Sequence, residues 1–243
     1  MDQMAWIREC GALGLDGVEL LGNHFPSTEE AYLCEVKKAC ADQFLSIAVA
    51  SAGGRLTVPD DAQRAAEVGA IGHWVDVAAF LGAPCVRFFC GSGPDLEAGG
   101  KELYGKVLKA VRDVVKLGAR KGIVMALENH GHTTADQLLS LHADVGSEFL
   151  KFTLDTGNFP PTSQVGPQTY ASIERCAPHA AIVHAKFFNV LPDGRDKDFD
   201  WHIIRDILAK AGFRGFLSVE YEGGDADEVA VMRRIAGFLK TLR

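Results

Sequence analysis

Four side chains of types that bind metal ions follow one another at similar intervals in the second half of the chain. They are Glu128, Asp155, His184 and Glu220, separated by 27, 29 and 36 residues. Three carboxylates and one imidazole form a predominantly oxygen ligand set. Such a set suits one divalent ion with coordination positions left open for a substrate. We expect Mn²⁺ first, with Mg²⁺, Co²⁺ and Zn²⁺ as alternatives.

The segment "SVEYEG" at 218–223 also indicates a cation, by an argument that does not use the spacing of the four residues. Alternation along a strand places Glu220 and Glu222 on one face. Burying two carboxylates is unfavourable unless a cation meets them. Lys or Arg side chains in an ion-pair network are one alternative to a metal ion, but the regular spacing of the four residues favours a shared metal site.

Two further residues have the chemistry of a proton donor. Lys186 follows His184 by two positions, so both side chains point to the same face of a strand. Lys186 either donates to a developing oxyanion or a departing oxygen, or neutralises the carboxylates. His130 shares a face with Glu128 and is either a second acid or base or a supporting hydrogen-bonding histidine.

Short apolar runs alternate with helical patterns along the whole chain. Near-continuous apolar runs are typical of strands buried on both faces, as in parallel sheets. The patterns at 101–118 and 200–211 are amphipathic helices. Ser27 with Glu30, and Thr134 with Gln137, have capping-box spacing at helix starts. The predicted strands are 16–22, 45–53, 85–91, 122–131, 151–158, 181–188 and 216–223.

This alternation predicts an α/β fold, either a closed barrel or an open doubly wound sheet. In a closed barrel the carboxyl ends of neighbouring strands surround one mouth, which would bring the four ligand candidates together. No glycine-rich dinucleotide fingerprint follows the early strands. We therefore predict a (β/α)8-type TIM barrel forming a single domain over residues 1–243. The chain opens with a helix-like segment, so the first strand of the barrel is lacking.

A closed barrel would bring two polar residues from the first half of the chain to the same mouth. Glu19 in "GVEL" and Arg87 in "VRFF" lie on predicted strands whose carboxyl ends face the same mouth. We expect both side chains to contact substrate hydroxyl groups. The alternative is an ion pair inside the barrel.

Composition limits which partners the protein can bind and which cellular compartment it is expected in. The 243 residues carry a formal net charge of −7, which argues against nucleic acid because phosphate binding relies on clustered Lys and Arg. No run of 18 apolar residues is present, so no membrane partner is expected. The six cysteines lack the paired spacings of zinc or redox motifs and are typical of reduced core residues. We expect a cytoplasmic protein, although residues preceding Met1 would hide an export signal.

Five motifs together resemble a known family. In order along the chain, "DGVEL", "ALENHG", "LDTGNFP", "VHAKFF" and "SVEYEG" are similar to the xylose isomerase-like TIM barrel superfamily, in its sugar phosphate isomerase/epimerase branch. The resemblance implies that the four ligand candidates bind one divalent metal, and that Glu128 and Glu220 also form the acid-base pair. It also implies that Asn158 faces the substrate.

The same resemblance implies a reaction. A base takes the proton next to the carbonyl of a small-molecule sugar, sugar phosphate or cyclitol, and a metal stabilises the enediolate, as in an isomerase or epimerase. Three positions depart from the pattern of ketose 3-epimerases, namely Phe187, Val190 and Thr134. A metal-dependent lyase, dehydratase or deglycosidase acting on keto-sugars or keto-glycosides is therefore the alternative. Lys186 or His130 would then protonate the departing oxygen.

Two other classes fit the residues less well. The apurinic-site endonucleases of the same fold need additional histidines on earlier strands, and 45–53 and 85–91 contain none. The other class is a non-catalytic partner subunit. A barrel that lacks its first strand has an uncovered gap, and a second chain in a homodimer or hetero-oligomer would cover it.

Overall fold

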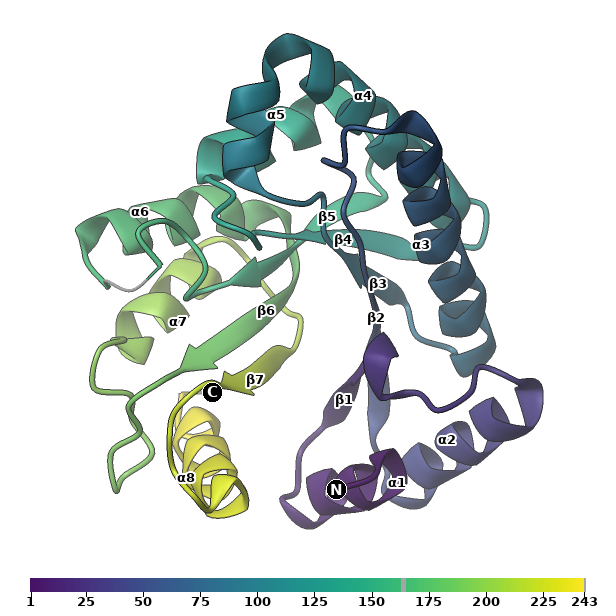
Figure 1. Cartoon of the computed structure of the whole chain (residues 1–243). Coiled ribbons are helices and arrows are strands. Elements are labelled where there is room, and N and C mark those ends of the chain that lie inside the picture. The colour runs from purple at the N-terminus through teal and green to yellow at the C-terminus, as the bar shows by residue number, and fades with distance from the viewer. Residues whose placement is uncertain (163–164, 243) are drawn as a thin grey trace.

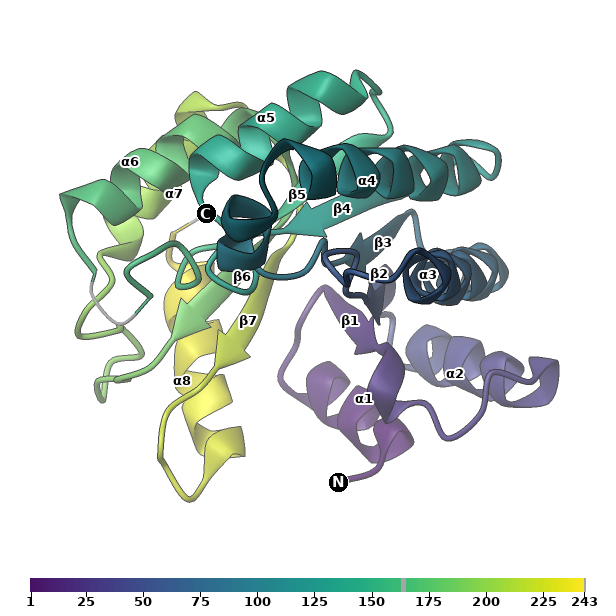
Figure 2. The ribbon, with the colours of Figure 1, turned by 45° about the horizontal axis from the view of Figure 1, so that its top comes forward.

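The strands form one parallel sheet that curves into a nearly closed barrel (Figures 1 and 2). The computed structural model describes residues 1–162 and 165–242. Within them the sheet has seven strands, and each pairs in parallel with the next along the chain. The predicted TIM barrel is confirmed, and every predicted strand overlaps an observed one. The strands are β1 (Gly17–Leu21), β2 (Ser46–Gly53), β3 (Cys85–Phe88), β4 (Val124–Glu128), β5 (Leu150–Asp155), β6 (Ala180–Phe187) and β7 (Leu217–Tyr221).

Helices cover the outer face of the barrel (Figure 2); α2 to α7 each lie between two strands in sequence, while α1 precedes β1 and α8 follows β7. The Thr134–Gln137 capping box is confirmed at the start of α5. The Ser27–Glu30 box is wrong, because α2 begins at Glu30 and the Ser27 hydroxyl instead accepts from the Glu29 amide at 3.0 Å. The helices are α1 (Gln3–Ala12), α2 (Glu30–Asp42), α3 (Asp61–Leu81), α4 (Gly93–Ala119), α5 (Ala135–Val145), α6 (Pro167–Cys176), α7 (Trp201–Lys210) and α8 (Glu228–Lys240), with short 3-10 turns η1 (Gly22–His24) and η2 (Ala177–His179).

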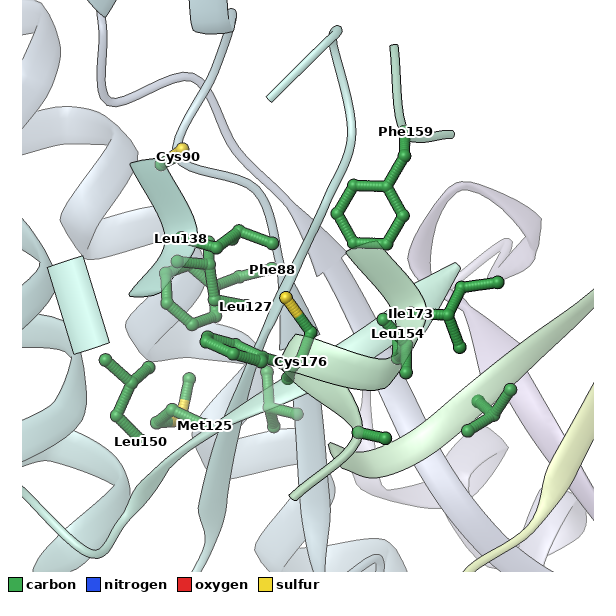
Figure 3. Packing of buried hydrophobic residues seen from close by; sticks show 14 of the residues in the cluster. Phe88, Cys90, Met125, Leu127, Leu138, Leu150, Leu154, Phe159, Ile173 and Cys176 are labelled. Carbon is green, nitrogen blue, oxygen red and sulfur yellow. The ribbon is translucent and has the colours of Figure 1, made fainter. Parts of the chain in front are cut away.

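Alternation along the strands divides the apolar residues into an outer and an inner layer. The outer layer packs strands such as β3 and β4 against helices, and Figure 3 shows Phe88 and Leu127 beside Leu138 of α5. A small inner cluster fills the barrel: Ala48, Val49, Cys85, Ala126 and Ile182. The polar side chains that follow on the same inward face therefore lie at the carboxyl ends of the strands.

The first and last strands are the two edges of the sheet, since β1 and β7 pair with one neighbour each in the described residues. Side chains bridge these edges. The Lys240 ammonium donates to the Gly14 carbonyl at 2.8 Å, and the Phe216 ring lies against Gly17. The end of α8 is thereby fixed to the loop before β1.

Among the described residues, no helix is long and apolar enough to cross a bilayer. All six cysteines are free thiols, and five of them are buried.

Candidate metal centre

The inward polar residues of β4 to β7 meet at one point because the strands are in register. Asp155 lies directly beside His184 on the neighbouring strand, and Lys186 lies beside Glu220. Glu128 ends β4, one strand before Asp155. Parallel pairing thus places at one mouth the side chains that are 27 to 36 residues apart in sequence.

His184 lies at the centre of the cluster. Its Nε2 is 2.9 Å from Glu19 Oε2, and its Nδ1 faces three carboxylates. That nitrogen is 3.1 Å from Glu220 Oε2, 3.6 Å from Asp155 Oδ2 and 3.9 Å from Glu128 Oε1. When His184 is neutral, a proton on Nε2 held by Glu19 leaves the Nδ1 lone pair directed at the carboxylates, which is the usual arrangement of a metal-binding histidine and its carboxylate partner.

Asp155 is held by the turn that follows β5. Its Oδ1 accepts from the backbone amides of Gly157 at 2.7 Å and Asn158 at 3.1 Å. Its own backbone amide donates to Asn129 at 2.7 Å. These bonds leave Oδ2 directed toward His184 and toward Asn158, whose side-chain amide donates to it at 3.0 Å.

Arg87 joins Glu19 and Glu128 on the opposite side of the cluster. The guanidinium donates to Glu128 Oε2 at 2.6 Å and lies 3.2 Å from Glu19 Oε1. The Ser51 hydroxyl completes this network, since it accepts from Arg87 Nε at 2.9 Å and donates to Glu19 Oε1 at 2.7 Å. Both oxygens of Glu19 are therefore engaged inside the barrel.

Lys186 brings a second cation close to the cluster. Its side chain is 1 % exposed, and its Nζ lies 3.2 Å from Asp155 Oδ2, 2.8 Å from Glu220 Oε2 and 2.9 Å from Glu222 Oε1. These contacts raise the pKa of Lys186 against the opposing effect of burial. The ammonium accordingly keeps its proton at neutral pH.

The two glutamates of the cluster differ in electrostatic environment. Burial raises the pKa of Glu128 to about 7, and the charges of His184 and Arg87 offset only part of that effect. Burial acts in the same direction on Glu220, but the nearby imidazole of His184 and the charge of Lys186 outweigh it, so the pKa of Glu220 is lowered. Two carboxyl groups with pKa values pushed apart are a common arrangement for an acid and a base.

Glu19 and His184 stabilise each other's charged form. Burial raises the pKa of Glu19, yet the charge and hydrogen bond of His184, together with Arg87, lower it to about 2. Burial lowers the pKa of His184, but Glu19, Asp155 and Glu220 raise it well above its usual value. The cluster thus attracts positive charge strongly enough to keep a buried imidazole protonated when no other cation balances it.

The donor set fits a divalent ion. One ligand atom each from Glu128, Asp155 and His184 lies within 4.8 Å of the others. Metal-ligand bonds of about 2.0 to 2.3 Å place two ligands of one ion at most about 4.6 Å apart, so small side-chain movements suffice. Among the described residues, His184 Nδ1 and Glu220 Oε2 are buried without a hydrogen-bond partner. Glu220 lies outside the group of three but contributes this unpartnered oxygen next to His184.

His130 lies at the rim rather than in the cluster. Its ring stacks on Phe89, with ring centroids 4.2 Å apart and planes inclined by 21°, and Phe89 in turn contacts the Arg87 guanidinium. Burial and the Arg87 charge lower the pKa of His130. It is therefore neutral at pH 7.

The structure brings together eight of the nine residues singled out from the sequence and leaves His130 at the edge. Roles as ligand, acid, base or substrate contact stay predictions for all nine. Two further residues, Ser51 and Asn129, were not foreseen. Glu222 was noted in "SVEYEG" as a carboxylate that a cation must meet, without a role in the site.

Comparison with known proteins identifies the family. Residues 7–242 match the model of the family described as xylose isomerase-like TIM barrel. A comparison with curated proteins finds no match. The family match spans nearly the whole chain, including all the polar residues of the cluster.

Solved structures of low sequence identity share the fold. D-psicose 3-epimerase from Clostridium cellulolyticum H10 superposes with a TM-score of 0.80 at 18 % identity, covering 100 % of this chain and 93 % of that one. A xylose isomerase-like TIM barrel protein from Mycobacterium smegmatis in complex with magnesium gives 0.76 at 19 %, covering 98 % and 88 %. A probable 3-DHS dehydratase from Bacillus anthracis gives 0.76 at 16 %, covering 99 % and 94 %. With the family match over residues 7–242, the chain belongs to the xylose isomerase-like TIM barrel family.

Proposed function

We propose that this protein is a metal-dependent sugar isomerase or epimerase that removes a proton next to a carbonyl group. The observation that carries the proposal is the buried His184 Nδ1, which has no hydrogen-bond partner among the described residues and faces three carboxylates. A divalent ion held by Glu128, Asp155, His184 and Glu220 would supply Lewis-acid stabilisation of negative charge on substrate oxygens. The magnesium complex of the Mycobacterium smegmatis structure supports a divalent ion in this fold.

Glu220 is the proposed base. Its side chain is 36 % exposed, against 1 % for Glu128, so it is the more accessible of the two to a substrate at the barrel mouth. Its lowered pKa keeps it ionised at neutral pH and hence able to accept a proton. Glu128, with a pKa of about 7, is suited to hold and return a proton on the other side.

Substrate hydroxyl groups have donors and acceptors at the same mouth. Asn158 is half-buried and donates to Glu128 Oε1 at 3.3 Å and to Asp155 Oδ2 at 3.0 Å, so its amide lies where a bound sugar would reach the cluster. Arg87 fixes Glu128 through a charge-assisted hydrogen bond. A small polar molecule such as a keto-sugar is the substrate class that this lining favours.

Elimination by a dehydratase or a related lyase is the second candidate. It is favoured by His130, a neutral and exposed imidazole at the rim that can exchange protons near pH 7. The likeness to the probable dehydratase from Bacillus anthracis supports the same candidate. In that reaction the neutral His130 would first have to take up a proton before it could give one to the departing oxygen, whereas the raised pKa of Lys186 keeps its proton on the ammonium.

Solvent deuterium exchange tests the proposal. Keto-sugars and their phosphates are incubated with the protein and Mn²⁺ in deuterated water and followed by NMR. We expect deuterium at a single carbon beside the carbonyl, with an epimer or isomer as product; loss of water or an aglycone would indicate the second candidate. Glu220→Gln should reduce exchange by at least about 10²-fold, the usual contribution of a general base.

The matched control is Glu97→Gln, which removes one carboxylate from an exposed position of α4. It should exchange as the unchanged protein does. Full exchange in Glu220→Gln, with circular dichroism unchanged, would remove Glu220 as the base.

A further inference from the structure

Lys186 is surrounded by three carboxylates but makes a well-formed hydrogen bond to only one of them in the described residues. The Nζ donates to Glu222 Oε1 at 2.9 Å. It is equally close to Glu220 Oε2 at 2.8 Å, yet that oxygen is without a hydrogen-bond partner. The carboxylate that accepts a hydrogen bond from Lys186 is thus one that is not among the four ligand candidates.

The backbone fixes both partners of this pair. The Glu222 amide donates to the Phe187 carbonyl at 2.9 Å, which ties the residue after β7 to the end of β6. Register places Lys186 opposite Glu220 and Phe187 opposite Tyr221, so Glu222 is the next position along. On the other side, the stem of Lys186 lies against Gly157, where an added Cβ would be 2.6 Å from Lys186 Cγ.

We propose that Glu222 is a positioning residue that shares the Lys186 ammonium with the ligand candidates Asp155 and Glu220, and so weakens the pairing of the ammonium with those two carboxylates. The inference rests on the proposed metal site. Without Glu222, the strongest remaining partners of the buried Lys186 are those two carboxylates. The lysine would then compete with a divalent ion for the same oxygens. The closer the ammonium lies to the ion, the stronger is the repulsion between the two positive charges.

The geometry makes this role specific to Glu222. Its side chain is 53 % exposed, whereas the side chain of Lys186 is 1 % exposed, so the carboxylate reaches inward from the rim to a cation that solvent does not reach. Removing the partner of a buried charged group is unfavourable in free energy, so the ammonium would pair with the acceptors that remain. In this cluster those acceptors are the ligands.

The test measures Mn²⁺ affinity by titration calorimetry in two backgrounds. Glu222→Gln in the unchanged protein should raise the dissociation constant about tenfold, within the range of coupling between contacting charged residues. The same substitution in a Lys186→Met background should raise it less than about twofold, because the competing ammonium is gone. This difference separates positioning through Lys186 from a general loss of negative charge.

Glu228→Gln is the control, since it removes one exposed carboxylate at the start of α8. Its dissociation constant should stay within about twofold of the unchanged protein. An equal loss of affinity from Glu222→Gln in both backgrounds would overturn the inference, as would unchanged affinity when Glu222→Gln is made in the protein that keeps Lys186. If the unchanged protein still binds Mn²⁺ in those cases, the proposed metal site is retained and only the proposed role of Glu222 is wrong. If it binds no divalent ion, both fall.

Discussion

At the scale of single residues, the orientation of His184 decides what the cluster can bind. Glu19 accepts from Nε2, and this leaves Nδ1 toward the carboxylates. The sequence predicted Glu19 as a substrate contact, and that role stays untested. Its 7 % exposed side chain is however occupied by Ser51, Arg87 and His184, which favours an orienting role.

Replacing Glu19 by Gln tests this orienting role. The amide can present its NH₂ group to Nε2, so the imidazole no longer keeps a fixed tautomer. We expect Mn²⁺ affinity to fall about 10- to 100-fold, as is typical when the partner of a metal-binding histidine is changed. Calorimetric titration of the purified variant measures it.

Ser51→Ala is the matched control because it removes a donor to Glu19 while leaving the contact with His184 in place. Its affinity should fall less than that of Glu19→Gln. If Glu19→Gln instead binds Mn²⁺ normally and raises only the KM for a sugar, the predicted substrate contact is right and the orienting role is wrong.

Residue types were readable from sequence, but their contacts were not. The chemistry of Glu128, Asp155, His184 and Glu220 was predictable from their position at strand ends. Ser51 and Asn129 gave no signal, since a serine and an asparagine near strand ends are also common in ordinary turns. Which carboxylate partners Lys186 depends on side-chain geometry that neither spacing nor alternation specifies.

At the scale of elements, hydrophobic patterning predicted the seven strands because each reads as a short apolar run; β3 to β6 are almost fully buried, while the edge strands β1 and β7 are only partly buried. It did not predict register. Shifts interrupt the pairing of β1 with β2 at Val18/Glu19 and of β5 with β6 at Phe152/Thr153. Such local irregularities decide which inward residues become neighbours, and a one-residue slip would turn them to the other face.

The turn after β5 gives a prediction at this scale. Gly157 lets the backbone pass the stem of Lys186 so closely that an added Cβ would lie 2.6 Å from Cγ and 3.1 Å from Cβ of that lysine. Gly157→Ala should therefore destabilise the protein by about 1 to 3 kcal/mol, the usual cost of overpacking a buried site. Urea unfolding measures the change.

Gly224→Ala provides the comparison, because a Cβ there meets nothing within 4 Å. It should change stability by no more than about 0.5 kcal/mol. Equal stability of the two variants would show that the Lys186 stem adjusts freely and is not held by this turn.

At the scale of the whole molecule, the barrel has an open seam between β1 and β7. Contacts across it come from Lys240 with the loop before β1 and from Phe216 with Gly17. The order of a helix before the first observed strand was predictable because residues 1–17 have a helix pattern. The prediction that a homodimer or hetero-oligomer covers this seam stays a prediction.

The whole arrangement also explains why one ion is expected. Four carboxylates, from Glu19, Glu128, Asp155 and Glu220, face the permanent cations Arg87 and Lys186 inside one barrel mouth. An excess of about two negative charges in a buried site is unfavourable unless protons or a cation balance it. The raised pKa of His184 is the proton response to this excess, whereas burial is the main cause of the raised pKa of Glu128 and the charges of Asp155 and Glu220 add to it.

The most direct test of this account is anomalous diffraction from crystals of the protein grown with Mn²⁺. We predict one strong peak at the barrel mouth, within bonding distance of His184 Nδ1 and of carboxylate oxygens from Glu128, Asp155 and Glu220. No peak at the mouth, or a peak that His184 does not contact while Lys186 stays bound to Asp155 and Glu220, would contradict it.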